Sequence, residues 1–180
     1  RTMVGGSAEW RHAIDTRNQV HFGAQLNAVR FPDNRIEDFD QLYVSAGWLR
    51  SFEGKGVPIL YLSAYATEDR AKNTFPDTDI DKSKNLFGIR SYVQYSLDEK
   101  VQLYNALGYT WRRDKDSYAR SSQVEKGRDE FGELLLGVAW TFRPACTLRT
   151  QVGFTRNQSN IDIYDFNRYE ILSSIRCDMN

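Results

Sequence analysis

The amino-acid sequence predicts an all-β fold: an antiparallel transmembrane β-barrel, or the C-terminal part of one, over residues 1–180 with no separate soluble domain. Apolar and polar residues alternate with period two along most of the chain, and no stretch keeps apolar residues at helical spacing. The alternating segments are long, and the polar connections between them are alternately short and long. These three observations are typical of a bacterial outer-membrane barrel, which has tight periplasmic turns and longer external loops.

The alternation predicts about nine strands of roughly 11 to 14 residues each, whereas a typical globular strand has about 5 or 6. They are expected near residues 4–14, 19–32, 40–53, 57–69, 85–98, 100–113, 130–143, 146–157 and 166–179. Short connections are expected at 15–18, 53–56, 97–100 and 143–146, and long ones at 32–39, 68–84, 113–129 and 157–165.

Each predicted strand has one apolar and one polar face. Val20, Phe22 and Leu26, for example, alternate with His21 and Gln25. If the apolar face meets lipid, the polar face lines the lumen, and its candidate residues are His21, Gln25, Arg90, Tyr92, Tyr104, Arg112, Glu133, Arg149, Gln151, Glu170 and Arg176. These residues would either tune the selectivity of a water-filled passage or pair with one another across a filled interior.

Aromatic residues on the apolar face gather near the strand ends. If the C-terminus is periplasmic, Trp48, Phe52, Tyr95, Trp140 and Phe142 fall near the periplasmic ends, and Phe87, Tyr109, Trp111, Phe154 and Tyr169 fall near the external ends. Two aromatic girdles around an aliphatic band are typical of outer-membrane barrels. A soluble ligand-binding β-barrel or sandwich would show the same alternation with its apolar face inward. The girdles and the rhythm of the connections favour the lipid-facing alternative.

The predicted strand number is odd. Single-chain barrels of this class have an even number of strands and periplasmic termini, so about nine strands ending in the periplasm would place Arg1 outside the cell. Strand edges exposed to lipid are not tolerated, so every strand must be paired. We therefore expect one uncounted strand, a larger barrel of which this chain is a part, a processed chain, or a second chain that completes the wall.

Composition excludes several classes of function. The 24 basic residues balance 24 acidic ones, which argues against nucleic acid as a partner. The longest apolar run, Leu134 to Trp140, is far too short for a transmembrane helix, which takes roughly 20 residues. His21 is the only histidine on a polar face, and no nucleophile motif accompanies it, so we expect no enzyme, cofactor or metal site.

The end of the chain resembles a known family. The stretch "GFTRNQSNIDIYDFNRYEILSSIRCDMN" from Gly153 onward, with its "RNQSN" and "YDFNR" motifs, and the upstream "GRDEFGELLLGVAW" resemble barrels that follow periplasmic tetratricopeptide repeats. They look most like the surface lipoprotein assembly modifier family, whose barrels help lipoproteins to cross the outer membrane. Exopolysaccharide-export porins are similar.

The resemblance implies an export or surface-display role for lipoproteins in the bacterial outer membrane, with an exopolysaccharide-export or general porin-like channel as the alternative. Its implied partners are outer-membrane lipid and lipopolysaccharide, the barrel-assembly machinery, a lipoprotein cargo and a periplasmic repeat module. The long loop that holds Arg120, Lys126 and Arg128 either touches lipopolysaccharide phosphates or is simply solvated.

The two cysteines yield a specific prediction. If the last two strands form a hairpin that folds near residue 162, Cys146 falls opposite Cys177 or its neighbour, on the same face. The location would be the periplasmic rim, where the compartment is oxidising. We therefore expect a Cys146–Cys177 disulfide; the alternative is a pair of free, half-buried thiols.

Overall fold

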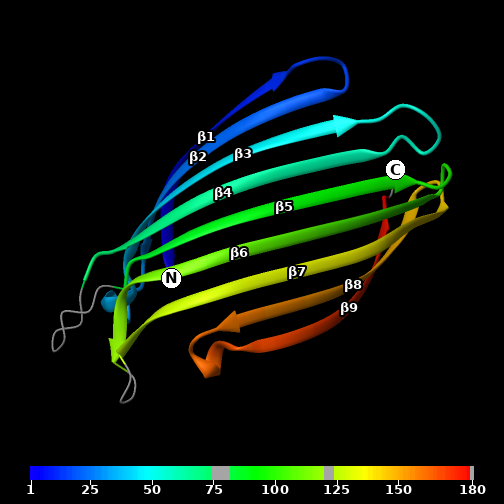
Figure 1. Cartoon of the computed structure of the whole chain (residues 1–180). Coiled ribbons are helices and arrows are strands. Elements are labelled where there is room, and N and C mark those ends of the chain that lie inside the picture. Colours follow the sequence, from blue (N-terminus) through cyan, green and yellow to red (C-terminus); the bar gives the residue numbers. More distant parts are fainter. Residues whose placement is uncertain (74–81, 120–123, 179–180) are drawn as a thin grey trace.

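A computed structural model describes residues 1–73, 82–119 and 124–178 of the chain. Within these residues nine strands form one antiparallel sheet in which each strand pairs with the next in chain order (Figure 1). The strands are β1 (Thr2–Ala13), β2 (Asn18–Arg30), β3 (Phe39–Ser51), β4 (Ile59–Ala71), β5 (Lys84–Ser96), β6 (Val101–Ala119), β7 (Val124–Arg143), β8 (Cys146–Ser159) and β9 (Phe166–Cys177). Two short 3-10 helices, η1 (Arg35–Glu37) and η2 (Asp162–Tyr164), lie in connections. The predicted all-β class and the strand number are confirmed.

The connections alternate between the two ends of the sheet. The β1–β2, β3–β4, β5–β6 and β7–β8 connections lie at the end that we call the short-turn end, drawn on the right in Figure 1. The other four connections lie at the opposite, long-loop end. In the β3–β4 connection, Gly54 and Gly56 have positive φ values of 106° and 83°, a conformation that glycine adopts without strain. The chain begins at the long-loop end, and β9 ends at the short-turn end.

One predicted loop is wrong. Residues 113–129 were expected to form a long connection, but β6 continues to Ala119 and β7 begins at Val124. Arg112 lies opposite Asp129, and Arg113 opposite Arg128, so polar residues continue the ladder of the hairpin. A hairpin with polar residues on both faces lacks the alternation that identifies a half-buried strand, which is why the pattern reads as a loop.

The sheet has two distinct faces. We call the face that carries His21 and Arg90 the inner face, and the face that carries Phe22 and Leu107 the outer face. In Figure 1 the sheet is curved, with β1 and β9 behind the central strands. Among the described residues, the buried hydrophobic side chains are only Val29, 1% exposed, and Ala139, 7% exposed. The usual hydrophobic core of a soluble domain is therefore missing from this sheet.

Polar residues are buried instead. The buried polar or charged residues in the described part of the chain are Asn27, Asp69, Ser83, Asp114, Asp129, Thr155 and Asn157. Most of them lie on the inner face, whereas large outer-face side chains such as Phe22 and Leu107 are 54% exposed. The distribution is inverted relative to a soluble β-protein, because polar groups pack against each other inside and apolar groups face outward.

The sheet is not closed. β1 pairs only with β2 and β9 only with β8 among the described residues, and both edge strands are exposed along their whole length. The closed cylinder expected from the sequence is therefore absent from this structure, which shows an open, curved nine-stranded wall. None of the helices in the described ranges is long and apolar enough to span a bilayer.

Candidate functional site: the inner and outer faces of the sheet

Every residue predicted to line a lumen lies on the inner face. The strand register places Arg90 opposite Gly108, Gly108 opposite Glu133, and Gln151 opposite Gly137. The same face carries His21, Gln25, Tyr92, Tyr104, Arg112, Arg149, Glu170 and Arg176. Period-two alternation determines this common face once the strands pair in register. That the face lines a lumen stays a prediction.

Tyrosines pack across the inner face from strand to strand. The Tyr61 ring stacks on His21 with centroids 5.6 Å apart, and Tyr43 stacks on Tyr65 at 5.7 Å. The Tyr61 hydroxyl lies 3.3 Å from His21 Nε2, and the Tyr65 hydroxyl lies 2.6 Å from Thr110 Oγ1. Tyr43, Tyr61 and Tyr65 are inner-face residues that the sequence did not single out.

The row of tyrosines continues across β5 and β6. Tyr92 and Tyr104 stack with centroids 6.5 Å apart. The Tyr92 hydroxyl donates to Gln94 Oε1 at 2.9 Å, and the Tyr104 hydroxyl donates to Gln151 Oε1 at 3.2 Å. Tyr104 lies over Gly137, where an added Cβ would come within 2.2 Å of its ring. Glycine opposite tyrosine therefore makes room for large polar rings on a crowded inner surface.

A cavity of about 260 Å³ opens on the inner face around Arg90. The Arg90 guanidinium lies over the Tyr65 ring, 4.9 Å from its centroid, a cation–π arrangement. Charged residues on the cavity wall include Glu133, Arg168 and Glu170, and Arg168 lies 3.7 Å from Glu170. Two arginines and two glutamates in one cavity form a mixed-charge surface, the kind that tunes passage through a pore.

A chain of polar side chains crosses the inner face near the long-loop end. Gln25 donates to Asn27 at 3.0 Å, Asn27 donates to Gln41 at 3.0 Å, and Gln41 donates to Asp69 at 2.8 Å. Lys84 Nζ lies 3.6 Å from the other Asp69 carboxylate oxygen. The buried Asp69 is thus both hydrogen-bonded and ion-paired, as burial of a carboxylate requires.

The chain of polar groups continues on β6 and β7. Arg112 Nη1 lies 2.9 Å from Asp129 Oδ2, and Arg112 Nε lies 3.3 Å from Asp114 Oδ1. Both aspartates are buried. Pairing of facing charges, one of the two roles expected for the polar face, is therefore present within the wall at this end.

The outer face carries the residues predicted for the aromatic girdles, except that Phe52 lies in a turn and not on a strand. Phe87 and Trp111 stack at 5.5 Å near the long-loop end, and Trp140 and Phe142 pack at 5.8 Å near the short-turn end. Phe52 lies just beyond the end of β3, in the β3–β4 turn. The other predicted members on this face are Trp48, Tyr95, Tyr109, Phe154 and Tyr169.

One aromatic pair at the short-turn end was missed. Trp10 and Phe22 lie opposite each other on β1 and β2, with ring centroids 5.7 Å apart. Both are more than half exposed on the outer face. Their positions close to the β1–β2 turn were visible in the sequence, and the same alternation that found Trp48 would have found them.

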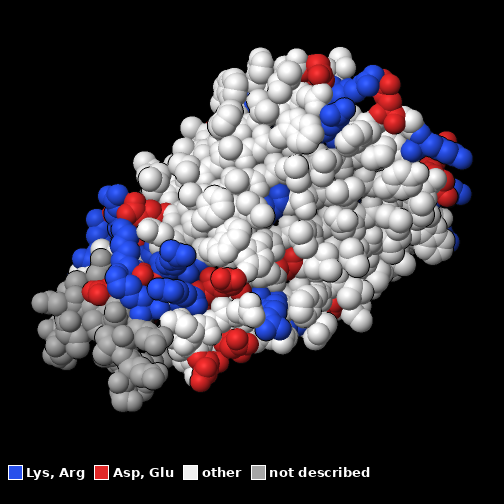
Figure 2. Space-filling view, viewed as in Figure 1, with Lys and Arg blue, Asp and Glu red and all other residues white. Residues whose placement is uncertain are grey.

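Charged residues on the outer side are concentrated at the two ends of the sheet. Figure 2 shows a broad band of mostly uncharged side chains, with a few isolated charged groups within it, between a charged region at the long-loop end and another at the short-turn end. On β3 the band runs between Asp40 and Arg50, ten residues apart. That separation is about 33 Å along a strand, or about 25 Å across a membrane at a barrel tilt of about 40°.

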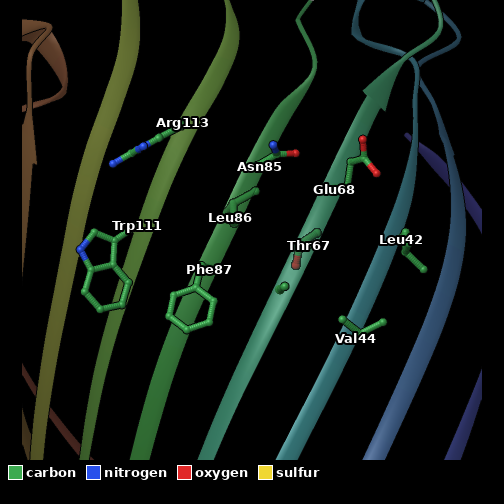
Figure 3. A pocket seen from close by; sticks show the side chains of 10 residues that line it. Leu42, Val44, Thr67, Glu68, Asn85, Leu86, Phe87, Trp111 and Arg113 are labelled. Carbon is green, nitrogen blue, oxygen red and sulfur yellow. The ribbon is translucent and has the colours of Figure 1, made fainter.

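A shallow groove of about 680 Å³ lies on the outer face near the long-loop end. Figure 3 shows Val44, Phe87 and Trp111 on its apolar part, with Glu68 and Arg113 further toward the loops. Leu42, Ala66, Thr67, Asn85 and Leu86 complete its lining.

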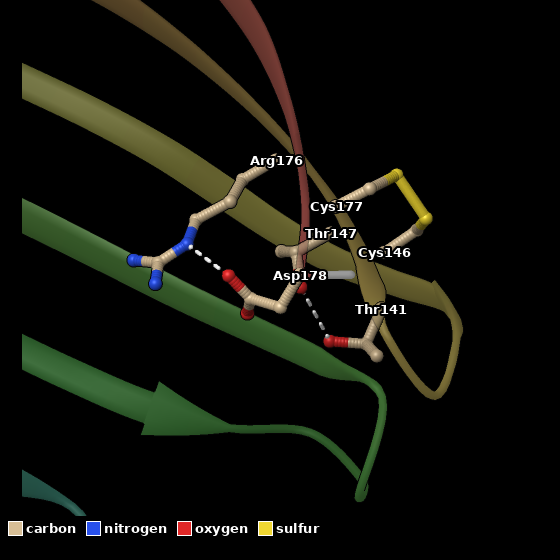
Figure 4. Close-up of a disulfide and its surroundings, with 6 residues drawn as sticks. All are labelled: Thr141, Cys146, Thr147, Arg176, Cys177 and Asp178. Atoms are coloured by element: carbon tan, nitrogen blue, oxygen red, sulfur yellow. Dashed lines mark hydrogen bonds and ion pairs between the residues drawn. A yellow bond between two sulfur atoms is a disulfide. The ribbon is translucent and has the colours of Figure 1, made fainter. Parts of the chain in front are cut away.

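The structure contains the expected Cys146–Cys177 disulfide. The two residues lie opposite each other in the β8–β9 ladder with Cα atoms 4.2 Å apart. Figure 4 shows the sulfur atoms on one side of the hairpin and Arg176, which lies 3.0 Å from Asp178, reaching away from them. The bond fixes edge strand β9 to β8 at the short-turn end.

Asp15 organises the turn between β1 and β2. Its carboxylate accepts hydrogen bonds from the backbone N–H of Arg17 at 2.7 Å and from the backbone and side-chain amides of Asn18. The Arg17 N–H, followed by the Asn18 side chain, holds the pKa of Asp15 below its usual value. The turn is therefore stabilised by the ionised carboxylate.

Comparison of the chain with protein-family models, with curated proteins and with solved structures gave no significant match.

Arg120, one of the residues expected to contact lipopolysaccharide, lies outside the described residues; Lys126 and Arg128 lie on β7.

Proposed function

We propose that this chain forms part of the wall of an outer-membrane β-barrel that exports lipoproteins or displays them on the cell surface. The observation that carries the membrane location is the inverted distribution of side chains. An exposed apolar outer face lies between two charged ends, and buried polar groups lie on the inner face. In water such a large exposed apolar area would drive aggregation, whereas in a bilayer it is the stable arrangement.

The strand lengths support the same location. A transmembrane strand needs about 9 to 11 residues, and the shortest strands here, β1 and β9, have 12 residues. In the proposed barrel the long-loop end faces the cell exterior and the short-turn end the periplasm. The disulfide at the short-turn end then lies in an oxidising compartment.

The lipoprotein cargo is supported by the resemblance of the last strands to surface lipoprotein assembly modifiers. The inner face adds a surface suited to a polar passage, with Arg90, Glu133 and Glu170 around one cavity. The proposed route for the polar part of a cargo runs along this face, while its lipid moiety stays at the membrane.

An exopolysaccharide channel is the second candidate. The observation that favours it is the row of inner-face tyrosines, Tyr43, Tyr61, Tyr65, Tyr92 and Tyr104. Flat aromatic faces with polar tips suit the alternating apolar and hydroxyl surfaces of sugars. A soluble ligand-binding barrel is disfavoured, because its apolar face should be the occluded one.

The first experiment locates the protein. We expect it to fractionate with the outer membrane, to need detergent for extraction, and to migrate faster on a gel when unheated than when heated. Recovery of folded, monodisperse protein from the soluble fraction without detergent would exclude the membrane proposal.

The second experiment addresses the cargo. In a strain that lacks the gene, we expect less surface lipoprotein, measured by protease shaving of intact cells, and unchanged secreted polysaccharide. Arg90→Gln should lower lipoprotein exposure, and Arg143→Gln, which removes an equal charge at the exposed β7 end, should not. Loss of polysaccharide with normal lipoprotein exposure would favour the channel alternative and contradict the cargo proposal.

A further inference from the structure

We propose that the outer face near the long-loop end binds a phosphorylated, acylated glycolipid of the outer leaflet. Its phosphates would contact Arg113 and Arg128, and its acyl chains would lie in the groove over β3 to β6. This inference rests on the proposed membrane location and adds a specific lipid site to it.

Two arginines face each other on the outer side of the β6–β7 hairpin. Arg113 and Arg128 are directly opposite in the ladder, and both residues are exposed. Neither makes an ion pair with any residue in the described ranges. Like charges directly opposite on one sheet face destabilise a strand pair, so a bound anion would offset a repulsion that the chain leaves uncompensated.

A carboxylate on the same face, two residues from Arg128, already has a hydrogen-bond partner. Glu130, opposite Trp111, accepts a hydrogen bond from the Tyr109 hydroxyl. On β4, Glu68 is shared by Arg70 at 2.9 Å and Lys115 at 2.6 Å. Two cations on one carboxylate leave the border of the groove with excess positive charge.

The position of the arginine pair relative to the apolar band indicates the kind of anion. Arg113 is the next residue after Trp111 on the same face of β6. Figure 3 shows Arg113 beyond the aromatic part of the groove, on the side of the loops. In the proposed barrel this is the depth of the lipid headgroups, just above the aromatic girdle. Arginine binds phosphate through two parallel N–H bonds, which makes this pair a suitable phosphate clamp.

The groove supplies the matching apolar surface. Val44 is 43% exposed and Phe87 49% exposed, and the Phe87 and Trp111 rings form a stacked wall. Charge and apolar area are therefore adjacent, as they are in a glycolipid that carries phosphates above its acyl chains. A soluble anionic polymer would use the arginines without the groove.

The test uses the protein purified from outer membranes in detergent and freed of lipid, with native mass spectrometry as the readout. Its three probes are bis-phosphorylated lipid A, the same lipid with its phosphates removed, and inorganic phosphate. We expect the wild-type chain to prefer the phosphorylated lipid by tenfold or more, because a net bond to a charged group corresponds to about tenfold in affinity. Inorganic phosphate should bind far more weakly, because it has no acyl chains for the groove.

Matched variants assign the effect to the pair. Arg113→Gln with Arg128→Gln should abolish the preference, and Lys55→Gln with Lys100→Gln, which removes equal charge at the short-turn end, should keep it. Arg113→Lys with Arg128→Lys keeps the charges but loses the paired N–H donors, so an intermediate preference is expected. Trp111→Ala should weaken the binding of both lipids by the same factor.

The unfolding equilibrium in lipid-free detergent provides a second readout. Removing the like-charge pair should leave stability unchanged or raise it; a loss of stability would mean a structural role and overturn the inference. Equal binding of both lipids, or a preference that survives in the glutamine variant, would overturn it too. A wild-type chain that inserts into the outer membrane but shows no preference defeats this inference alone, whereas a chain absent from the membrane defeats the proposed function first.

Discussion

Replacing Leu107 by arginine tests whether the outer face meets lipid. Leu107 lies on the outer face of β6, midway between Val101 and Arg113, and is 54% exposed. If that exposed surface faces water, an arginine there changes the free energy of unfolding by about 0.5 kcal/mol or less. If it faces the bilayer midplane, the cost is about 2 to 4 kcal/mol, which lowers the folding equilibrium constant about 30- to 700-fold.

Leu103 supplies the matched control. It lies on the same face of the same strand, closer to the short-turn end, and is 41% exposed. Near a membrane interface the cost of arginine falls to about 0 to 1 kcal/mol. The assay is the denaturant dependence of folding in lipid vesicles, with Leu107→Arg and Leu103→Arg measured side by side. Costs within about 0.5 kcal/mol of each other would refute the assignment of the outer face to lipid.

Three further predictions follow from local geometry. Replacing Cys146 and Cys177 by serine should lower the free energy of unfolding by about 4 kcal/mol, because the unfolded chain is no longer constrained by a closed loop. The two cysteines that close this loop are 31 residues apart in sequence. An unchanged denaturation midpoint between oxidised and reduced wild type would contradict the prediction. Gly137→Ala should lower the free energy of unfolding by about 1 to 3 kcal/mol, because the Tyr104 ring must move. Gly132→Ala is the control: its added Cβ would lie 3.6 Å from Tyr109, an ordinary contact, so the free energy of unfolding should not change. Equal effects of the two substitutions in thermal unfolding would show that the inner face is not crowded. Because the pKa of Asp15 is lowered, its stabilisation of the turn is present above the ordinary aspartate pKa of about 3.9 and is lost as pH falls through the folded-state pKa. The protection of the Asn18 amide, measured as its exchange rate relative to the intrinsic rate at the same pH, should therefore fall on acidification in the wild type and be low at every pH in Asp15→Ala; wild-type protection that does not change with pH would contradict the prediction.

The face of each strand residue was predictable because side chains alternate strictly once a strand is paired. This is why His21, Arg90 and Glu170, from strands far apart in sequence, share the inner face. Phe52 departs from its expected place because the β3–β4 connection begins earlier than alternation suggests. Turn geometry depends on local backbone conformation, which alternation does not encode.

The contacts within the inner face were less predictable. Tyr61 and Tyr65 escaped notice because tyrosine has an apolar ring and a polar tip, so it blurs the distinction between the two phases of β4. The pairing of Gln41 with Asp69 depends on the register between β3 and β4, and Arg112 with Asp129 on the register of β6 and β7. Registers follow from many weak cross-strand interactions that a single sequence does not reveal.

The direction of the edge strands constrains how such a wall closes. β1 and β9 both run from the long-loop end to the short-turn end, so direct pairing between them would be parallel. A second copy rotated about the barrel axis would place β9 beside the copy's β1, again in parallel. A copy turned end over end would pair antiparallel but would place its long loops on the opposite side of the membrane. In the proposed barrel, antiparallel closure with all long loops on one side therefore requires an odd number of further strands between β9 and β1, which makes the total even, as in bacterial single-chain barrels.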